Sequence, residues 1–310
     1  MRVSKAIRAG AWALVAAGVI APVLRRRAKL PSPLVLAAGM ASVPALAVAV
    51  PRSRTRDMGI CALNMWAYLA AYKMPNDHPE CLRARVRVGY PIAADRIIGL
   101  GVPPTIRLQA LADRARIGRL ERALVWSHWV WFAVPHSTLA FILWRAPERF
   151  PFAAARMYAV FDIGAVLYWA VPTAPPWYAS EQGSLRHDPL PQVRRKMIDY
   201  GQDFWGERWG DLYDVLGGNP LAAMPSLHFA TSVMGARLLG ELSPLAGAIG
   251  WAYAATLGVA LVYLGEHYVI DLVAGGALAA TVCTQAWHAE PTLRGLSRAL
   301  QALERRAVAG

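Results

Sequence analysis

Residues 221–233 read LAAMPSLHFATSV and residues 262–276 read VYLGEHYVIDLVAGG, and we interpret these two stretches as the centre of the fold. Between them, residues 244–264 form an apolar segment long enough to cross a hydrocarbon core about 30 Å thick at about 1.5 Å rise per residue. A chain that leaves the first stretch as one helix and returns through a second brings His228 and His267 to the same membrane face. The pattern therefore predicts a paired-histidine site at the ends of membrane helices.

The first stretch has the residue types of an anion-binding helix start. Pro225 has no amide proton and suits the first turn of a helix. The N–H groups of Ser226, Leu227 and His228 are then expected to remain free at the positive end of that helix, where a phosphate can bind. We therefore count Pro225 and Ser226 among the candidate substrate-binding residues.

The second stretch carries a candidate nucleophile. His267 and Asp271 are spaced to share one face of a helix, so the carboxylate can bond one ring nitrogen and fix the tautomer. The other nitrogen is then free to attack phosphorus, and His228 can protonate the leaving oxygen. Either half alone is equally consistent with side chains that only hydrogen-bond a neighbouring helix. Ionisable groups inside a membrane cost about 2.5–3.5 kcal/mol each, so three together favour function.

These residues resemble known signatures. Pro225-Ser226-Leu227-His228 resembles the second signature of the type 2 phosphatidic acid phosphatase (PAP2) superfamily, and His267-Tyr268-Val269-Ile270-Asp271 resembles its third. Residues 171–177, VPTAPPW, are similar to the first-signature region of one branch, the inositolphosphotransferase-like proteins related to inositol phosphorylceramide synthase. The resemblance runs over about residues 57–287.

The resemblance implies an all-α, polytopic membrane protein with a six-helix PAP2-like core and a phosphohistidine on His267. Asp271 and His228 would be its catalytic partners, and Tyr268 joins the substrate-binding candidates. We expect no metal and no organic cofactor, because a histidine nucleophile needs none.

The stretches also depart from the family pattern. Ordinary lipid phosphatases of this superfamily carry a Lys and an Arg-Pro in the first signature and a Ser-Arg pair before the third-signature His. Here Leu261 stands in place of that Arg, and no Lys or Arg lies between Arg156 and Arg186. A dianionic monoester would lack its usual cations, which favours a singly charged phosphodiester. The polar loop before the second signature holds the cations that could reach such a phosphate: Arg186, Arg194, Arg195, Lys196 and Arg208. Arg186 and Arg194 are the candidate replacements, although acidic neighbours make salt-bridged surface positions the commoner outcome for this group.

Composition places the chain in a membrane. It has 310 residues, 56% hydrophobic content and net charge +13, and its mean hydropathy is +0.30. The excess charge would suggest nucleic acid in a soluble protein, but arginines beside apolar runs are read more simply as cytoplasmic anchors and contacts to anionic headgroups, and we expect no nucleic-acid partner. The three cysteines are scattered and support neither a disulfide framework nor a metal site.

We divide the chain into three parts. Residues 1–56 contain two apolar runs separated by Arg25-Arg26-Arg27 and predict an N-terminal membrane hairpin rather than a cleaved signal peptide. Residues 57–290 are interpreted as the catalytic membrane domain and residues 291–310 as a cytoplasmic tail. No repeat or low-complexity segment is evident.

Apolar runs and helical periodicity predict further helices at residues 57–72, 124–144, 152–171 and 191–203. Within the basic connection 73–122, a helical apolar pattern fits a helix lying on the membrane surface, although an ordinary solvated helix fits nearly as well. His128 and His136 lie on related faces of the 124–144 helix, and we interpret them as packing or supporting residues rather than a metal pair.

Short loops orient the predicted site. Arg145, Arg149 and the basic tail lie at one face, whereas the turn at Gly265 and Glu266 has no basic residue. This pattern predicts a multi-pass plasma-membrane protein with its active site on the extracytoplasmic side. The basic connection 73–122 then falls on the outer side, against the rule, although long loops obey that rule poorly. Oligomeric state and the topology of residues 1–56 stay open.

Three functions remain. The first is a lipid phosphotransferase that moves a phosphate-linked headgroup, such as phosphoinositol, from a phospholipid donor to a lipid or glycan hydroxyl. The second is a lipid phosphate phosphatase that uses the same residues with water as acceptor, on a (poly)prenyl or diacylglycerol phosphate. The third is a non-catalytic lipid-binding or transport protein.

Overall fold

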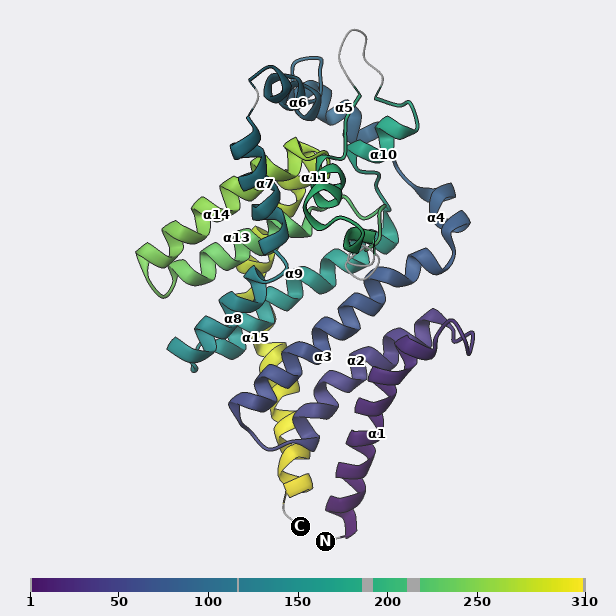
Figure 1. The fold of residues 1–310 in the computed structure, drawn as a ribbon. Helices are drawn as coiled ribbons and strands as arrows, with labels where there is room; N and C mark the ends of the chain where they lie inside the picture. Colours follow the sequence, from purple (N-terminus) through teal and green to yellow (C-terminus); the bar gives the residue numbers. More distant parts are fainter. Residues whose placement is uncertain (1, 116, 186–191, 211–217, 309–310) are drawn as a thin grey trace. The chain divides into compact units, whose positions relative to one another are not determined.

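The computed structural model describes residues 2–115, 117–185, 192–210 and 218–308 (Figure 1). Apart from isolated backbone bridges, the regular structure in these ranges is helical. Five of the described helices contain segments long and apolar enough to span a membrane: Ser4–Leu24, Ser32–Ala49, Phe150–Ala170, Pro244–Tyr263 and Val269–Ala286. The chain is therefore an all-α, polytopic membrane protein, which confirms the fold class predicted from the sequence.

Two compact units make up the chain, residues 1–78 with 283–310 and residues 79–282. The last helix, α15 (Val269–Val308), begins in the second unit, and its residues from Cys283 onward belong to the first. The functional boundaries expected at 1–56, 57–290 and 291–310 stay a prediction.

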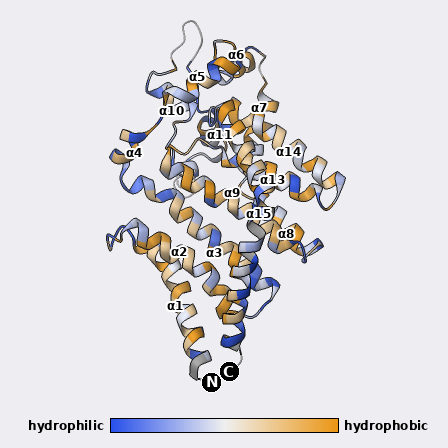
Figure 2. Ribbon diagram, turned by 180° about the vertical axis from the view of Figure 1, so that it is seen from behind, coloured by the Kyte–Doolittle hydropathy of each residue, from blue (hydrophilic) through white to orange (hydrophobic). Residues whose placement is uncertain are grey.

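The first unit contains α1 (Arg2–Leu24), α2 (Ser32–Ala49), α3 (Arg54–Lys73) and the 3₁₀ turn η1 (Met74–Asp77). Figure 2 shows α2 as largely hydrophobic. Small side chains form the core of this unit, and they let helices approach closely: Ala11, Ala45, Val48, Ala49 and Ala307. The two apolar runs of residues 1–56 are thus the helices α1 and α2, and their assignment as a membrane hairpin stays a prediction.

Ion pairs fasten the polar ends of this unit. Arg25 and Arg26 bind the carboxylate of Asp77 at 2.7 and 2.6 Å. Arg56 binds Glu304 at 2.9 Å. Residues 291–308, predicted as a tail, are thus a continuation of α15, and Arg56 on α3 pairs with this part of the helix.

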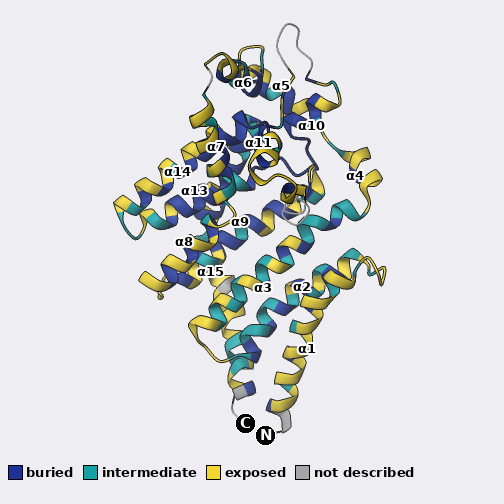
Figure 3. Cartoon of the chain, viewed as in Figure 1, coloured by how far each residue is buried: buried dark blue, intermediate teal, exposed yellow. Residues whose placement is uncertain are grey.

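The second unit holds the signature stretches. Its helices are α4 (Pro79–Arg85), α5 (Gly89–Ile98), α6 (Pro104–Ala115), α7 (Gly118–Val130), α8 (Val134–Arg145), α9 (Phe150–Ala170), α10 (Pro176–Glu181), α11 (Lys196–Trp205), α13 (Leu227–Gly240), α14 (Pro244–Tyr263) and the start of α15. Helices α13 and α14 lie side by side (Figure 1). A Cβ at Gly247 would lie 2.6 Å from the Cα of Gly240, so this close approach requires glycine. Figure 3 shows the long buried runs of α9 and α13.

Two predicted helices are interrupted. The helix expected over 124–144 is divided between α7 and α8, with turns between them. Pro135 lies in the first turn of α8, where its missing N–H costs nothing, but it cannot continue a helix from α7. The helical pattern in the basic connection is likewise divided between α6 and the start of α7.

Candidate active site

Two turns deliver the signature residues to one place. Ser226 caps α13, because its Oγ accepts the amide proton of Phe229 at 3.3 Å. Between α14 and α15 the chain turns at Gly265, whose φ of +81° favours glycine. The amide of His267 then bonds back to the carbonyl of Leu261 at 3.1 Å. His267 therefore stands just outside the first turn of α15.

The three predicted catalytic residues form a continuous row. His228 Nδ1 lies 3.2 Å from His267 Nε2, and His267 Nδ1 lies 3.3 Å from Asp271 Oδ2. His267 is 4% exposed and Asp271 is fully buried. A carboxylate beside Nδ1 holds the proton there, so Nε2 of His267 carries the lone pair and His228 Nδ1 donates to it.

Backbone bonds orient the carboxylate and join the two signatures. Asp271 Oδ2 also accepts the amide proton of Tyr268 at 2.9 Å. The backbone carbonyl of Asp271 accepts the amide proton of Ser226 at 2.9 Å. The amide of Ser226 is therefore not free for an anion, contrary to the expectation from the sequence. Leu227 and His228 donate their amide protons to no other described residue, so two of the three expected donors remain.

Pro225 and Tyr268 lie outside the row of catalytic side chains. Pro225 follows a cis peptide bond and precedes the helix cap, so it is not in the first turn of α13 as expected. Its carbonyl accepts the hydroxyl proton of Tyr168 at 2.7 Å. Tyr268 is fully buried in a hydrophobic cluster with Ile106 and Leu185. This placement is that of a packing residue, and a substrate contact by Tyr268 stays a prediction.

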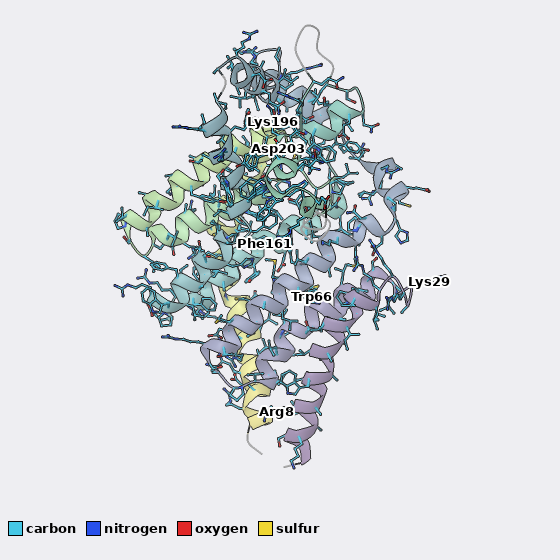
Figure 4. The ribbon with its side chains drawn as sticks, in the orientation of Figure 1. Arg8, Lys29, Trp66, Phe161, Lys196 and Asp203 are labelled. Atoms are coloured by element: carbon cyan, nitrogen blue, oxygen red, sulfur yellow. The ribbon has the colours of Figure 1, made fainter. Side chains whose placement is uncertain are left out.

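Of the two predicted loop cations, only Arg194 lies within the described residues. Arg186 lies outside the described residues. Arg194 is half exposed, and its Nη2 lies 2.7 Å from both carboxylate oxygens of Asp113. Lys196, labelled in Figure 4, binds the same carboxylate at 3.2 Å. Leu261 is fully buried in a hydrophobic cluster, so no charge replaces the family arginine at that position.

Arg195, which the sequence did not distinguish from the other loop cations, lies beside the site. Its Nε and Nη2 bind the two carboxylate oxygens of Glu266 at 2.8 and 3.1 Å. Its guanidinium lies 4.1 Å from the ring centre of Trp177, in the first-signature stretch. Glu266 directly precedes His267, and the amide of Trp177 donates to the carbonyl of Gly265 at 3.1 Å. Nothing in the run Arg194-Arg195-Lys196 distinguishes its middle member, because only the fold brings it to the third signature.

Asp95 is a residue of the site region that sequence reasoning missed. It is fully buried on α5, and its two oxygens accept the amide protons of Val269 and Ile270 at 3.0 Å each. It thus caps the helix that carries Asp271 from a distant part of the chain. Burial raises the pKa of Asp95, and these backbone bonds oppose that rise. Its position in the sequence carries no signal beyond a single carboxylate among apolar residues.

Aromatic rings enclose His228 on the side of α7. The ring of Trp131 lies 4.1 Å from that of His228, and its indole N–H donates to Thr231 Oγ1 at 2.9 Å. The ring of His128 lies 4.9 Å from that of His228. His136 instead stacks on Phe161. Among the described residues, no group of three His, Cys, Asp or Glu side chains could hold a metal ion.

The first-signature stretch lies beside the second. Thr173 forms isolated backbone bridges with Arg87 and Ala222. Its amide donates to the carbonyl of Leu221 at 2.9 Å, and the amide of Ala223 donates back at 3.2 Å. The three stretches singled out in the sequence therefore meet in one place, next to the His228–His267 contact.

Comparison with known proteins finds a matching family and two similar proteins. The family model described as PAP2 superfamily matches residues 92–284. Inositol phosphorylceramide synthase catalytic subunit aur1 of Schizosaccharomyces pombe is 27% identical over 168 residues, which is 50% of this chain and 38% of that protein. Inositol phosphorylceramide synthase of Candida albicans is 27% identical over 171 residues, 50% of this chain and 34% of that protein. The matches thus span little more than a third of these relatives. No solved structure matches the chain.

Proposed function

Because the chain belongs to the PAP2 superfamily, we propose that it is a membrane-bound lipid phosphotransferase that moves a phosphate-linked headgroup from a phospholipid to a lipid or glycan hydroxyl. Membership places the chain among enzymes of the phosphotransferase and phosphatase type. The observation that carries the proposal is the row formed by Asp271, His267 and His228, with contacts of 3.3 and 3.2 Å.

In the first proposed step His267 is the nucleophile. Its Nε2 lone pair attacks phosphorus, the bond from phosphorus to the leaving oxygen breaks, and protonated His228 gives that oxygen a proton. The headgroup stays on His267 through its phosphate. In the second step an acceptor hydroxyl attacks phosphorus, His228 takes its proton, and the bond from phosphorus to nitrogen breaks. Both histidines return to their starting states.

Substrate must separate the two histidines. Their nitrogens are 3.2 Å apart in the structure, so the lone pair of the nucleophile is covered by His228. A phosphoryl group lying between them needs each nitrogen about 3 Å from its own reacting atom. The contact between His228 and His267 is thus a resting arrangement that a bound phosphate replaces, and the free amides of Leu227 and His228 lie at the same helix end.

The charges near this row suit a phosphodiester. Leu261 offers no charge, and Arg195 shares its single charge with Glu266. A dianionic monoester would therefore bring a second negative charge, which this one shared guanidinium does not balance. The names of the two relatives make phosphoinositol the first headgroup to test. The acceptor would carry a hydroxyl on a lipid or a glycan.

We place the enzyme in the plasma membrane with its site on the extracytoplasmic side. The support is the lack of basic residues in the turn at Gly265 and Glu266 and the presence of Arg145 and Arg149 at the other end of α9. A donor lipid of the outer leaflet would then reach the histidines directly.

The test is rapid-quench labelling of purified protein. A phosphodiester donor labelled in its headgroup is expected to leave label on His267 when no acceptor is present, and to be processed faster than labelled phosphatidic acid. Faster use of phosphatidic acid with release of inorganic phosphate would assign the chain as a phosphatase. Lipid exchange that survives His267→Ala would assign it as a lipid-binding or transport protein.

A further inference from the structure

His128 is a buried histidine that the proposed reaction does not use. It lies on α7 and is 4% exposed. Its Nδ1 is enclosed and has no hydrogen-bond partner among the described residues. A buried polar atom without a partner costs about 1–3 kcal/mol, so its retention needs a reason other than packing.

The position of His128 is next to the chemistry. Its ring and that of His228 are 4.9 Å apart at 30°, and the rings of His228 and His267 are 5.4 Å apart. Three imidazoles thus form a row that ends at Asp271. A hydrogen bond ties α7 to α14, because the backbone carbonyl of Ser127 accepts the hydroxyl proton of Tyr253 at 3.0 Å.

Other groups on this side of His228 are already satisfied. Trp131 lies against His228 from the same end of α7, but its indole N–H is donated to Thr231. Arg195 and Glu266 bind each other and are near enough to act electrostatically on His128. Among these four side chains, His128 is the one whose polar atom has no hydrogen-bond partner in the described part of the chain, so it can bond a molecule that displaces the contact between His228 and His267.

The two proposed steps indicate whether the molecule that bonds His128 is the departing lipid or the incoming acceptor. The leaving oxygen and the incoming hydroxyl occupy the same place beside His228, since the second step reverses the first. A group that reaches His128 is therefore attached next to that oxygen. On a departing diacylglycerol only ester oxygens are found there. An acceptor with a second hydroxyl or an amide beside the reacting hydroxyl offers both a donor and an acceptor, which a neutral imidazole matches.

Building on the proposed function, we propose that His128 is an acceptor-binding residue that selects acceptors with a second hydroxyl or amide beside the reacting hydroxyl. Such an acceptor is held in line with phosphorus, whereas a simple alcohol or water is not. One hydrogen bond of this kind corresponds to about tenfold selectivity.

The experiment compares 1,2-octanediol with 1-octanol as acceptors, using the full-length enzyme in detergent and a donor labelled in its headgroup. Products of transfer and of hydrolysis are separated, and label on His267 is measured by rapid quench without acceptor. The wild type is expected to use the diol about tenfold better. His128→Ala is expected to lose this preference and to keep the labelling rate, and His128→Asn to restore part of the preference. His136→Ala, on α8 away from the row, is the control that should change neither quantity.

Two outcomes would overturn this inference and leave the proposed function standing. One is equal use of both alcohols by a wild type that takes label on His267, and the other is a diol preference that survives His128→Ala. A labelling rate that falls as far as transfer would instead make His128 a positioning residue for His228. Absence of any label on His267 would overturn the proposed function, and this inference with it.

Discussion

Single substitutions test the catalytic roles proposed for His267 and Asp271: His267→Ala and Asp271→Asn are expected to remove nearly all turnover. Alanine has no nucleophile. Asparagine keeps the size of Asp271 but favours the wrong tautomer of His267, an effect of about 10⁴-fold for the aspartate of a serine-protease triad. The measurement is turnover of a labelled diester, with the thermal midpoint in detergent as the control for folding. More than a few per cent of wild-type activity in either folded variant would contradict the assignment of the nucleophile.

The proposed role of His228 as a general acid predicts that the rate depends on the leaving group. General acid catalysis contributes about 10²–10⁴-fold where the departing oxygen needs a proton. His228→Ala should therefore greatly slow a phospholipid donor and largely spare a p-nitrophenyl phosphodiester, whose leaving group departs without help. Steady-state rates with both substrates provide the test. Equal losses would assign His228 to binding.

Arg195 is expected to contact the substrate phosphate through the donors that Glu266 leaves free, because it is held against Glu266 and Trp177 beside the proposed nucleophile, His267. Loss of charge-assisted hydrogen bonds worth about 1.5–3 kcal/mol should weaken competitive inhibition by inorganic phosphate about 10–100-fold in Arg195→Ala. Arg194→Ala is the matched control, since the neighbouring side chain binds Asp113 instead. Similar inhibition constants for both variants would remove Arg195 from the site.

At the scale of elements, the start of α15 depends on a cap from α5. Asp95→Asn keeps one oxygen that can accept an amide proton from Val269 or Ile270, but it places an NH₂ group against the second amide. The free energy of unfolding should therefore fall by about 1–3 kcal/mol. Turnover should fall further than stability explains, because the same turn sets His267 against His228. Asp113→Asn, which alters a more exposed carboxylate, is the control for loss of charge. Thermal midpoints and turnover of the two variants are compared, and equal effects would deny Asp95 a special role.

The elements near the site were only partly predictable. Apolar runs and the spacing of His267 and Asp271 predicted α14 and the start of α15, because both signals are local. The division between α7 and α8 was missed, since an apolar run does not reveal where a proline begins a new helix. Asp95 was missed, and Arg195 was not distinguished from the other loop cations, for a different reason: each reaches the third signature only through tertiary folding.

At the scale of the whole molecule, the charged segments of the second unit give conflicting signals about which membrane face carries the histidines. The carbonyl of Tyr263 accepts a hydrogen bond from Gln109 at 2.8 Å, and Arg85 bonds the carbonyl of Trp169 at 2.7 Å. The basic connection thus packs at the same end of α9 and α14 as the histidines. The positive-inside rule applied to short loops and the charge of this long segment therefore point in opposite directions, and sequence alone could not decide between them.

The sidedness of α9 provides the deciding test. This helix has 21 residues, a length of about 30 Å, so its two ends reach opposite membrane faces. Cys81 is exposed on α4, the helix whose Arg85 binds the site end of α9. Glu148 lies just before Phe150, at the opposite end of α9. In a background with Cys61→Ala and Cys283→Ala, a membrane-impermeant maleimide should label Cys81 in intact cells. With Cys81→Ala added, Glu148→Cys should react only after permeabilisation. The reverse pattern would place the histidines on the cytoplasmic side, where donor lipids of the inner leaflet would become the substrates to test.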